Sequence, residues 1–192
     1  MPEETKEIQY LRATRGSISS GKISDAMSLY RIAFNENPEN PEAKYFCKFT
    51  DFVDGFGTSE DVRYPFLYVI CSLEDAIKYV ATFDCSDYEK SLVLTTITST
   101  YDILFKYLLE AINLFEVDLI DEYIVGLYWL GSYIYDDFQE NSDLMAFAAD
   151  PWKKAIELHQ ECGCKHENYK IEDYVEKLKK IEPEYTVPEK PM

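Results

Sequence analysis

Apolar residues recur at helical spacing along most of the chain. Within residues 21–46, Ile23, Ala26, Tyr30 and Ala33 fall three or four positions apart, so they share one face of a helix. The period continues beyond this stretch, and no alternating strand pattern of useful length interrupts it. We therefore predict an all-α protein with about seven or eight helices in antiparallel pairs. The predicted helices cover residues 3–19, 23–36, 41–53, 64–82, 87–115, 117–139, 150–161 and 168–181.

Turn-forming residues separate these stretches. Gly21 can adopt the backbone angles of a tight turn, while Pro38 and Pro41 end one helix and begin the next. Residues 54–61 contain two glycines and several acids, which predicts a loop. Asn141 and the two residues after it predict a break.

Two further boundaries follow from capping residues and prolines. Ser72 followed by Asp75 predicts a capping box inside the 64–82 stretch, so a fresh helix can start there. Three prolines predict an extended tail over 183–192. We therefore predict a single all-α domain over residues 1–182.

Residues 8–46 carry a repeat-like pattern. Small residues stand at Gly21, Ala26 and Ala33, where two helices would cross, and Tyr30 fills a large position between them. The segment resembles the tetratricopeptide repeat, a helix-turn-helix unit of about 34 residues. A weaker match to the same pattern spans 127–131 and continues at Trp152, Ala155 and Ile156. The resemblance implies a right-handed superhelical or compact array of helix pairs that binds another protein.

The resemblance also implies where a partner would bind. Some members of the repeat family grip the terminal carboxylate of a peptide with basic and amide side chains from first-helix positions. The matching positions here are Leu11, Arg15, Tyr45 and Phe49, and among them only Arg15 suits a carboxylate. We therefore expect no carboxylate clamp. These four residues are instead the predicted lining of an aromatic and apolar groove for an amphipathic helix or extended peptide.

The charge balance restricts the partner. The formal net charge is −17, from 36 acidic against 19 basic residues. Such a surface repels nucleic acid and anionic membranes and tolerates or favours a basic protein or peptide. The alternative is that the acidity only keeps the protein soluble. The oligomeric state does not follow from the sequence.

The N-terminal residues and the cysteines indicate a compartment. The chain opens with acidic residues instead of a basic segment followed by an apolar core, so we expect no secretory signal. Five cysteines are an odd number. We therefore expect reduced thiols in a cytoplasm, and a bacterial-type protein.

One cluster has the residue types of a metal site. His159, Cys162, Cys164 and His166 provide four soft ligands within eight residues. Structural zinc sites usually space their cysteines more widely and draw ligands from two segments. We therefore expect that His159 packs in a helix pair, that the thiols lie in a surface turn and that no metal is bound.

Catalytic and cofactor patterns are weak. Residues 16–22 resemble a phosphate-binding loop, but Ile23 stands where that motif needs a hydroxyl for magnesium. Both histidines lie within 159–166, and no serine or cysteine stands in a recognisable nucleophile elbow. We expect neither an enzyme nor a cofactor.

Two functions remain open at this point. The first is a cytoplasmic protein–protein interaction scaffold that resembles tetratricopeptide-repeat proteins. The alternative is an acidic inhibitor of the immunity-protein kind, which masks a basic toxin or nuclease by charge complementarity.

Overall fold

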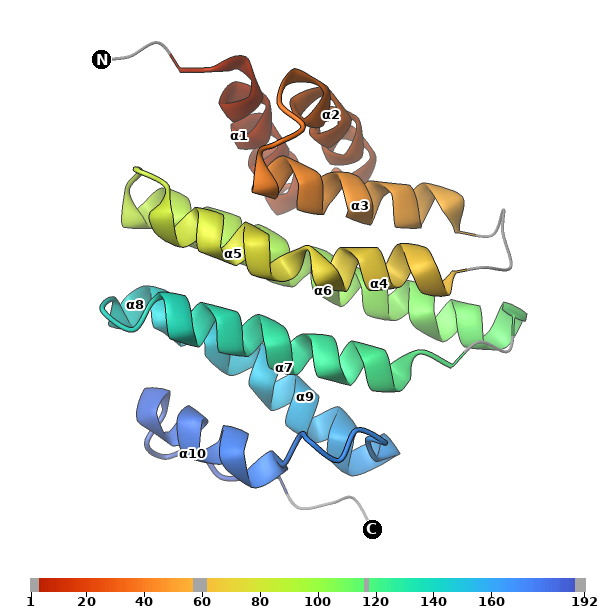
Figure 1. Ribbon diagram of the computed structural model, residues 1–192, viewed down its shortest axis with the longest axis vertical. Coiled ribbons are helices and arrows are strands. Elements are labelled where there is room, and N and C mark those ends of the chain that lie inside the picture. The colour runs from red at the N-terminus through yellow and green to blue at the C-terminus, as the bar shows by residue number, and fades with distance from the viewer. Residues whose placement is uncertain (1–3, 57–61, 116–117, 189–192) are drawn as a thin grey trace. The chain divides into compact units, whose positions relative to one another are not determined.

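The computed structural model describes residues 4–56, 62–115 and 118–188, and these residues form helices joined by turns (Figure 1). The all-α prediction is confirmed, and the described residues contain no β-strand element. The chain divides into two compact units, Met1–Tyr107 and Leu108–Met192. The single domain over residues 1–182 stays a prediction.

Within residues 4–56 and 62–107, the described part of the first unit, there are five complete helices and part of a sixth. They are α1 (Lys6–Ser19), α2 (Ile23–Glu36), α3 (Pro41–Gly55), α4 (Arg63–Cys71), α5 (Leu73–Thr82) and the portion of α6 (Asp87–Phe115) that reaches Tyr107. Helix α1 packs against α2, α2 against α3, and α3 against both α4 and α5.

The structure confirms two predictions in this region, the tight turn at Gly21 and the shared buried face of α2. Gly21 has φ of 72°, which favours glycine. Ala26, Tyr30 and Ala33 are fully buried. The Tyr30 ring stacks on Phe46 of α3 with centroids 4.0 Å apart, so the large side chain joins the helix pair to the next helix.

Side-chain caps begin α3 and α6, and the predicted cap at Ser72 is wrong. Asn40 accepts a hydrogen bond from the Ala43 amide at 3.1 Å and caps α3, while Ser86 accepts from the Glu89 amide at 3.3 Å and caps α6. Ser72 does not form the predicted box. Its hydroxyl donates to the Val69 carbonyl at 2.7 Å, so it closes α4 and makes no side-chain cap on α5.

The second unit contains the end of α6 and the C-terminal helices. These are α7 (Ile120–Asp137), α8 (Ser142–Met145), the 3-10 turn η1 (Ala146–Ala148), α9 (Ala149–Cys162) and α10 (Ile171–Ile181). Helix α7 packs against α9, and α10 packs on α9. The Trp152 and Tyr174 rings meet edge to face at 5.9 Å, so the last helix packs on α9 close to Trp152.

Some boundaries differ from the sequence prediction. Asn141 does lie in a break between helices, as predicted. Its side chain also caps the short helix α8 by accepting a hydrogen bond from the Leu144 amide at 3.1 Å. Helix α3 runs on through Gly55, and residues 57–61 of the predicted loop lie outside the described residues. Residues 183–188 form a turn and irregular backbone, and 189–192 also lie outside the described part.

Candidate functional site

The predicted groove residues lie in the core of the first unit. Leu11, Tyr45 and Phe49 are fully buried, and Arg15 is 4% exposed. The Tyr45 hydroxyl meets the Thr100 hydroxyl of α6 at 3.3 Å. Because other helices of the same unit cover these side chains, a partner cannot reach them in this conformation. The prediction that Leu11, Arg15, Tyr45 and Phe49 line an open groove is therefore wrong, because all four are buried.

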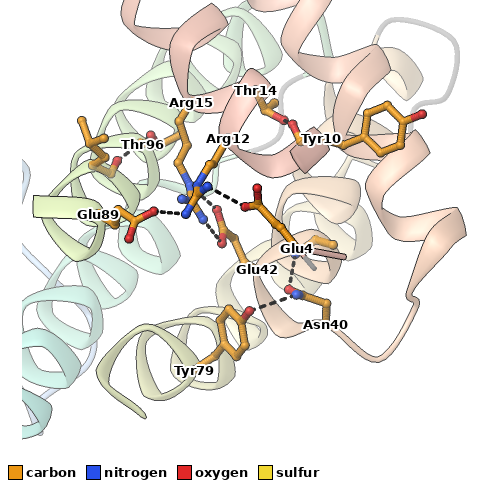
Figure 2. A network of polar contacts seen from close by, with 12 residues as sticks. Glu4, Tyr10, Arg12, Thr14, Arg15, Asn40, Glu42, Tyr79, Glu89 and Thr96 are labelled. Atoms are coloured by element: carbon orange, nitrogen blue, oxygen red, sulfur yellow. Dashed lines mark hydrogen bonds and ion pairs between the residues drawn. The ribbon is translucent and has the colours of Figure 1, made fainter. Parts of the chain in front are cut away.

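Arg15 forms a buried ion pair instead of a ligand contact. Its Nε and Nη2 donate to the two carboxylate oxygens of Glu42, at 2.9 and 2.6 Å (Figure 2). Burial raises the pKa of Glu42, and the Arg15 guanidinium opposes this shift. Burial also acts to lower the pKa of Arg15, but Glu42 more than offsets it and the pKa is raised. The pair links α1 to α3 at a considerable desolvation cost.

A second, partly exposed arginine lies beside this pair. Arg12 contacts Glu4 at 2.7 Å and also donates to Glu89 at the start of α6 (Figure 2). Burial acts to raise the pKa of Glu89, but hydrogen bonds and the charge of Arg12 lower it overall. The side chain of Arg12 is 50% exposed, so these contacts contribute little stability each.

These side chains border a cleft of about 390 Å³ between α1 and the start of α6. Its lining consists of Arg12, Arg15, Gly16, Ser19, Tyr88, Glu89 and Leu92. Both arginines are already paired with carboxylates, so the cleft carries no excess positive charge for an anion. Gly16 lies inside α1, so its segment lacks the open backbone of a phosphate-binding loop.

Exposed tyrosines are the prominent surface feature of the first unit. Tyr64 and Tyr68 stand one turn apart on α4 and are 60% and 58% exposed, and Tyr88 is 71% exposed. The Lys48 ammonium lies 5.7 Å from the centre of the Tyr68 ring. The sequence prediction gave 64–82 as a helical stretch and did not single out these tyrosines. The i, i+4 spacing of two tyrosines off the face of Phe66 and Val69 is the signal that would have revealed this pair.

The four candidate metal ligands do not converge. The Tyr128 hydroxyl and His159 Nδ1 are 3.0 Å apart, and burial lowers the pKa of His159 against the opposing charges of Asp121 and Glu172. His166 meets the Tyr169 ring edge on, with centroids 6.4 Å apart. Within the described ranges, no three His, Cys, Asp or Glu side chains form a group that can hold a metal ion. The four-ligand arrangement is therefore not assembled.

The two thiols of that cluster line a different cleft. Cys162 and Cys164 border a space of about 510 Å³, together with Ile112, Asp118, Ile120, Asp121, Gly163 and Lys165. Gly163 has φ of 75° and ends α9, so the helix stops one residue beyond the predicted end of the 150–161 stretch. All five cysteines of the chain are free thiols.

Comparison with family models, curated proteins and solved structures gives no significant match. The tetratricopeptide resemblance thus rests on the sequence alone, chiefly on residues 8–46. Among the described helices, none combines the length and apolar character required to cross a bilayer.

Proposed function

We propose that this protein is a non-catalytic interaction protein that binds a basic protein or peptide in the cytoplasm. The observation that carries the proposal is the Tyr64–Tyr68 pair, two largely exposed aromatic rings on one face of α4. Tyrosine is enriched at the centres of protein interfaces because it buries a large area while its hydroxyl keeps a polar contact. A partner surface laid across α4 would cover both rings together.

Charge supports a basic partner. In a chain with a net charge of −17, an arginine or lysine of the partner meets a favourable potential as it approaches. Exposed aromatic faces also attract such cations. The helices that resemble a repeat, α1 and α2, form a packed pair. This pair supports α3, and α3 packs against α4, which carries the two tyrosines.

The test is a paired-variant binding assay. A partner captured from the native host is measured against the wild type, the Tyr64→Ala/Tyr68→Ala variant and a Tyr88→Ala control. All three tyrosines are exposed, so the variants should fold. We expect the double variant to lose at least about tenfold in affinity, and the control to lose little. Equal affinities for the wild type and the double variant would remove α4 as the binding face.

A second candidate, the acidic inhibitor, is favoured by the charge of the second unit. Its sequence carries 19 Asp and Glu against 8 Lys, a larger excess of acid than in the first unit. An inhibitor of this kind would lose affinity steeply as salt rises, and it would bind without the α4 tyrosines. A salt series on the same variants therefore separates the two proposals.

A further inference from the structure

The Cys162–Cys164 pair brings two thiols together outside the surfaces proposed above. The two thiols are separated by one glycine and line the same cleft of the second unit. Cys162 is exposed and Cys164 is half-buried. A Cβ built on Gly163 meets no atom within 4 Å, so the space beside the pair is open.

The surroundings of the pair disfavour charged thiolates. Asp118 and Asp121 line the same cleft, together with Lys165, whose ammonium pairs with Asp121 at 3.3 Å. Cys162 is also the last residue of α9, where the helix dipole is negative. Burial raises the pKa of Cys162, and Glu161, Asp118 and Asp121 raise it further. The pKa of Cys164 is raised by burial together with Asp121 and Glu122, against a backbone hydrogen bond that lowers it. At neutral pH both groups are neutral thiols.

Two neutral thiols beside acidic side chains favour some thiol-binding species over others. Zinc normally needs four ligands, and the two histidines of the cluster point elsewhere. A monovalent soft cation such as Cu(I) would displace two protons and leave an extra negative charge beside two aspartates. A neutral trivalent arsenic acid has neither cost, because it condenses with neutral thiols to give a neutral product.

We propose that Cys162 and Cys164 form a dithiol site for trivalent arsenic, as arsenous acid or an organoarsenical. In this exchange two As–O bonds break, two As–S bonds form, and the two thiol protons leave with the displaced hydroxyls as two molecules of water. No oxidant or reductant takes part. The site is independent of the proposed protein-binding function.

The experiment uses phenylarsine oxide and the reduced full-length protein, with excess glutathione present as a monothiol competitor. Intact mass should show one phenylarsenic group retained by the wild type and by the Cys71→Ser control, which removes an exposed thiol of the first unit. The Cys162→Ser and Cys164→Ser variants should each lose at least about tenfold in retention, because one thiol cannot chelate. Circular dichroism of each variant establishes that it is folded. Equal retention by the wild type and either variant would overturn the proposal.

A pH series provides the second arm. Neutral exchange releases no protons, so retention of the arsenical should be nearly constant from about pH 6 to 8. A steep increase in retention with rising pH would show that the thiolates are required. It would overturn the proposal that neutral thiols exchange with the arsenical. One equivalent of zinc held through both cysteines would likewise overturn it, because it would require a converged multi-ligand site.

Discussion

The indole of Trp152 lies directly against Gly131, where helices α7 and α9 cross. A Cβ placed on Gly131 would lie 2.5 Å from both Cδ1 and Nε1 of Trp152. The indole is fully buried, and its Nε1 donates to the Tyr128 carbonyl at 3.2 Å, so it cannot move aside without losing that bond.

We expect Gly131→Ala to destabilise the protein by about 1–3 kcal/mol. Overpacking at this crossing outweighs the gain of up to about 1 kcal/mol from replacing a helical glycine. Urea unfolding followed by circular dichroism measures the effect. Gly16→Ala is the matched control, because a Cβ there meets no atom within 4 Å, and it should stabilise α1 by roughly 0.5–1 kcal/mol. Equal shifts in both variants would contradict the close crossing.

Tyr30→Phe tests a buried hydroxyl. The Tyr30 oxygen has no hydrogen-bond partner among the described residues, while its ring stacks on Phe46. Removing the oxygen keeps the stack and removes a desolvation cost, so we expect stability to be unchanged or raised by about 1 kcal/mol. Tyr45→Phe is the contrast, because that hydroxyl is bonded to Thr100, and it should lower stability. A loss in Tyr30→Phe as large as in Tyr45→Phe would refute this reading.

The Arg15–Glu42 pair should behave asymmetrically. Glu42→Ala leaves a buried guanidinium without its carboxylate, and we expect a loss of about 3–5 kcal/mol. The double variant Arg15→Met/Glu42→Leu removes both charges and should recover most of that loss. Chemical denaturation of the two proteins decides the matter. Equal losses in both would show that the packing of α1 on α3, and not the charge, governs this site.

The Tyr128–His159 contact predicts a loss of stability in mild acid. Burial lowers the pKa of His159 in the folded protein. In the unfolded chain this histidine has its ordinary pKa of about 6.5, so the unfolded chain takes up a proton first as the pH falls. The stability from the neutral imidazole is complete above that pH and is lost as pH falls through the lower, folded value. Melting temperatures between about pH 7.5 and 5.5 should fall more for the wild type than for His159→Gln. Identical slopes for the wild type and His159→Gln would exclude this mechanism.

Deleting α10 should unfold the second unit. Truncation after Glu167 removes Tyr174, which stacks on Tyr128, and Lys177, whose ammonium lies 5.6 Å from the Trp152 ring centre. We expect aggregation or lost helicity. Truncation after Glu182 is the control, because it retains the 2.6 Å Lys153–Glu182 contact. A monomeric Glu167 truncation with unchanged helicity per residue would show that α10 is dispensable.

The helices could be predicted from sequence because local rules determine them. Spacing of apolar residues placed α2 at 23–36, and Gly21 and Gly163 marked the turns. Ser72 shows the limit of these rules, because a serine can donate backward to close a helix as readily as it can cap the next one.

The candidate surfaces were less predictable because they depend on which helices cover which faces. Leu11 and Phe49 have the spacing of groove residues, but their burial is decided by helices distant in sequence. Arg15 gave no sign of Glu42, its partner 27 residues away. The separation of His159 from the two cysteines arises because Tyr128, on α7, holds the imidazole.

The positions of the two tryptophans provide an optical probe of cooperativity. Trp129 and Trp152 are the only tryptophans in the chain, and both belong to the second unit. Their fluorescence therefore follows the unfolding of residues 108–192 alone, whereas far-ultraviolet circular dichroism follows the helices of both units. Superimposed transitions from the two signals would identify a single cooperative unfolding event. Separated transitions would give each unit its own midpoint, and each substitution should then move only the midpoint of the unit that contains it.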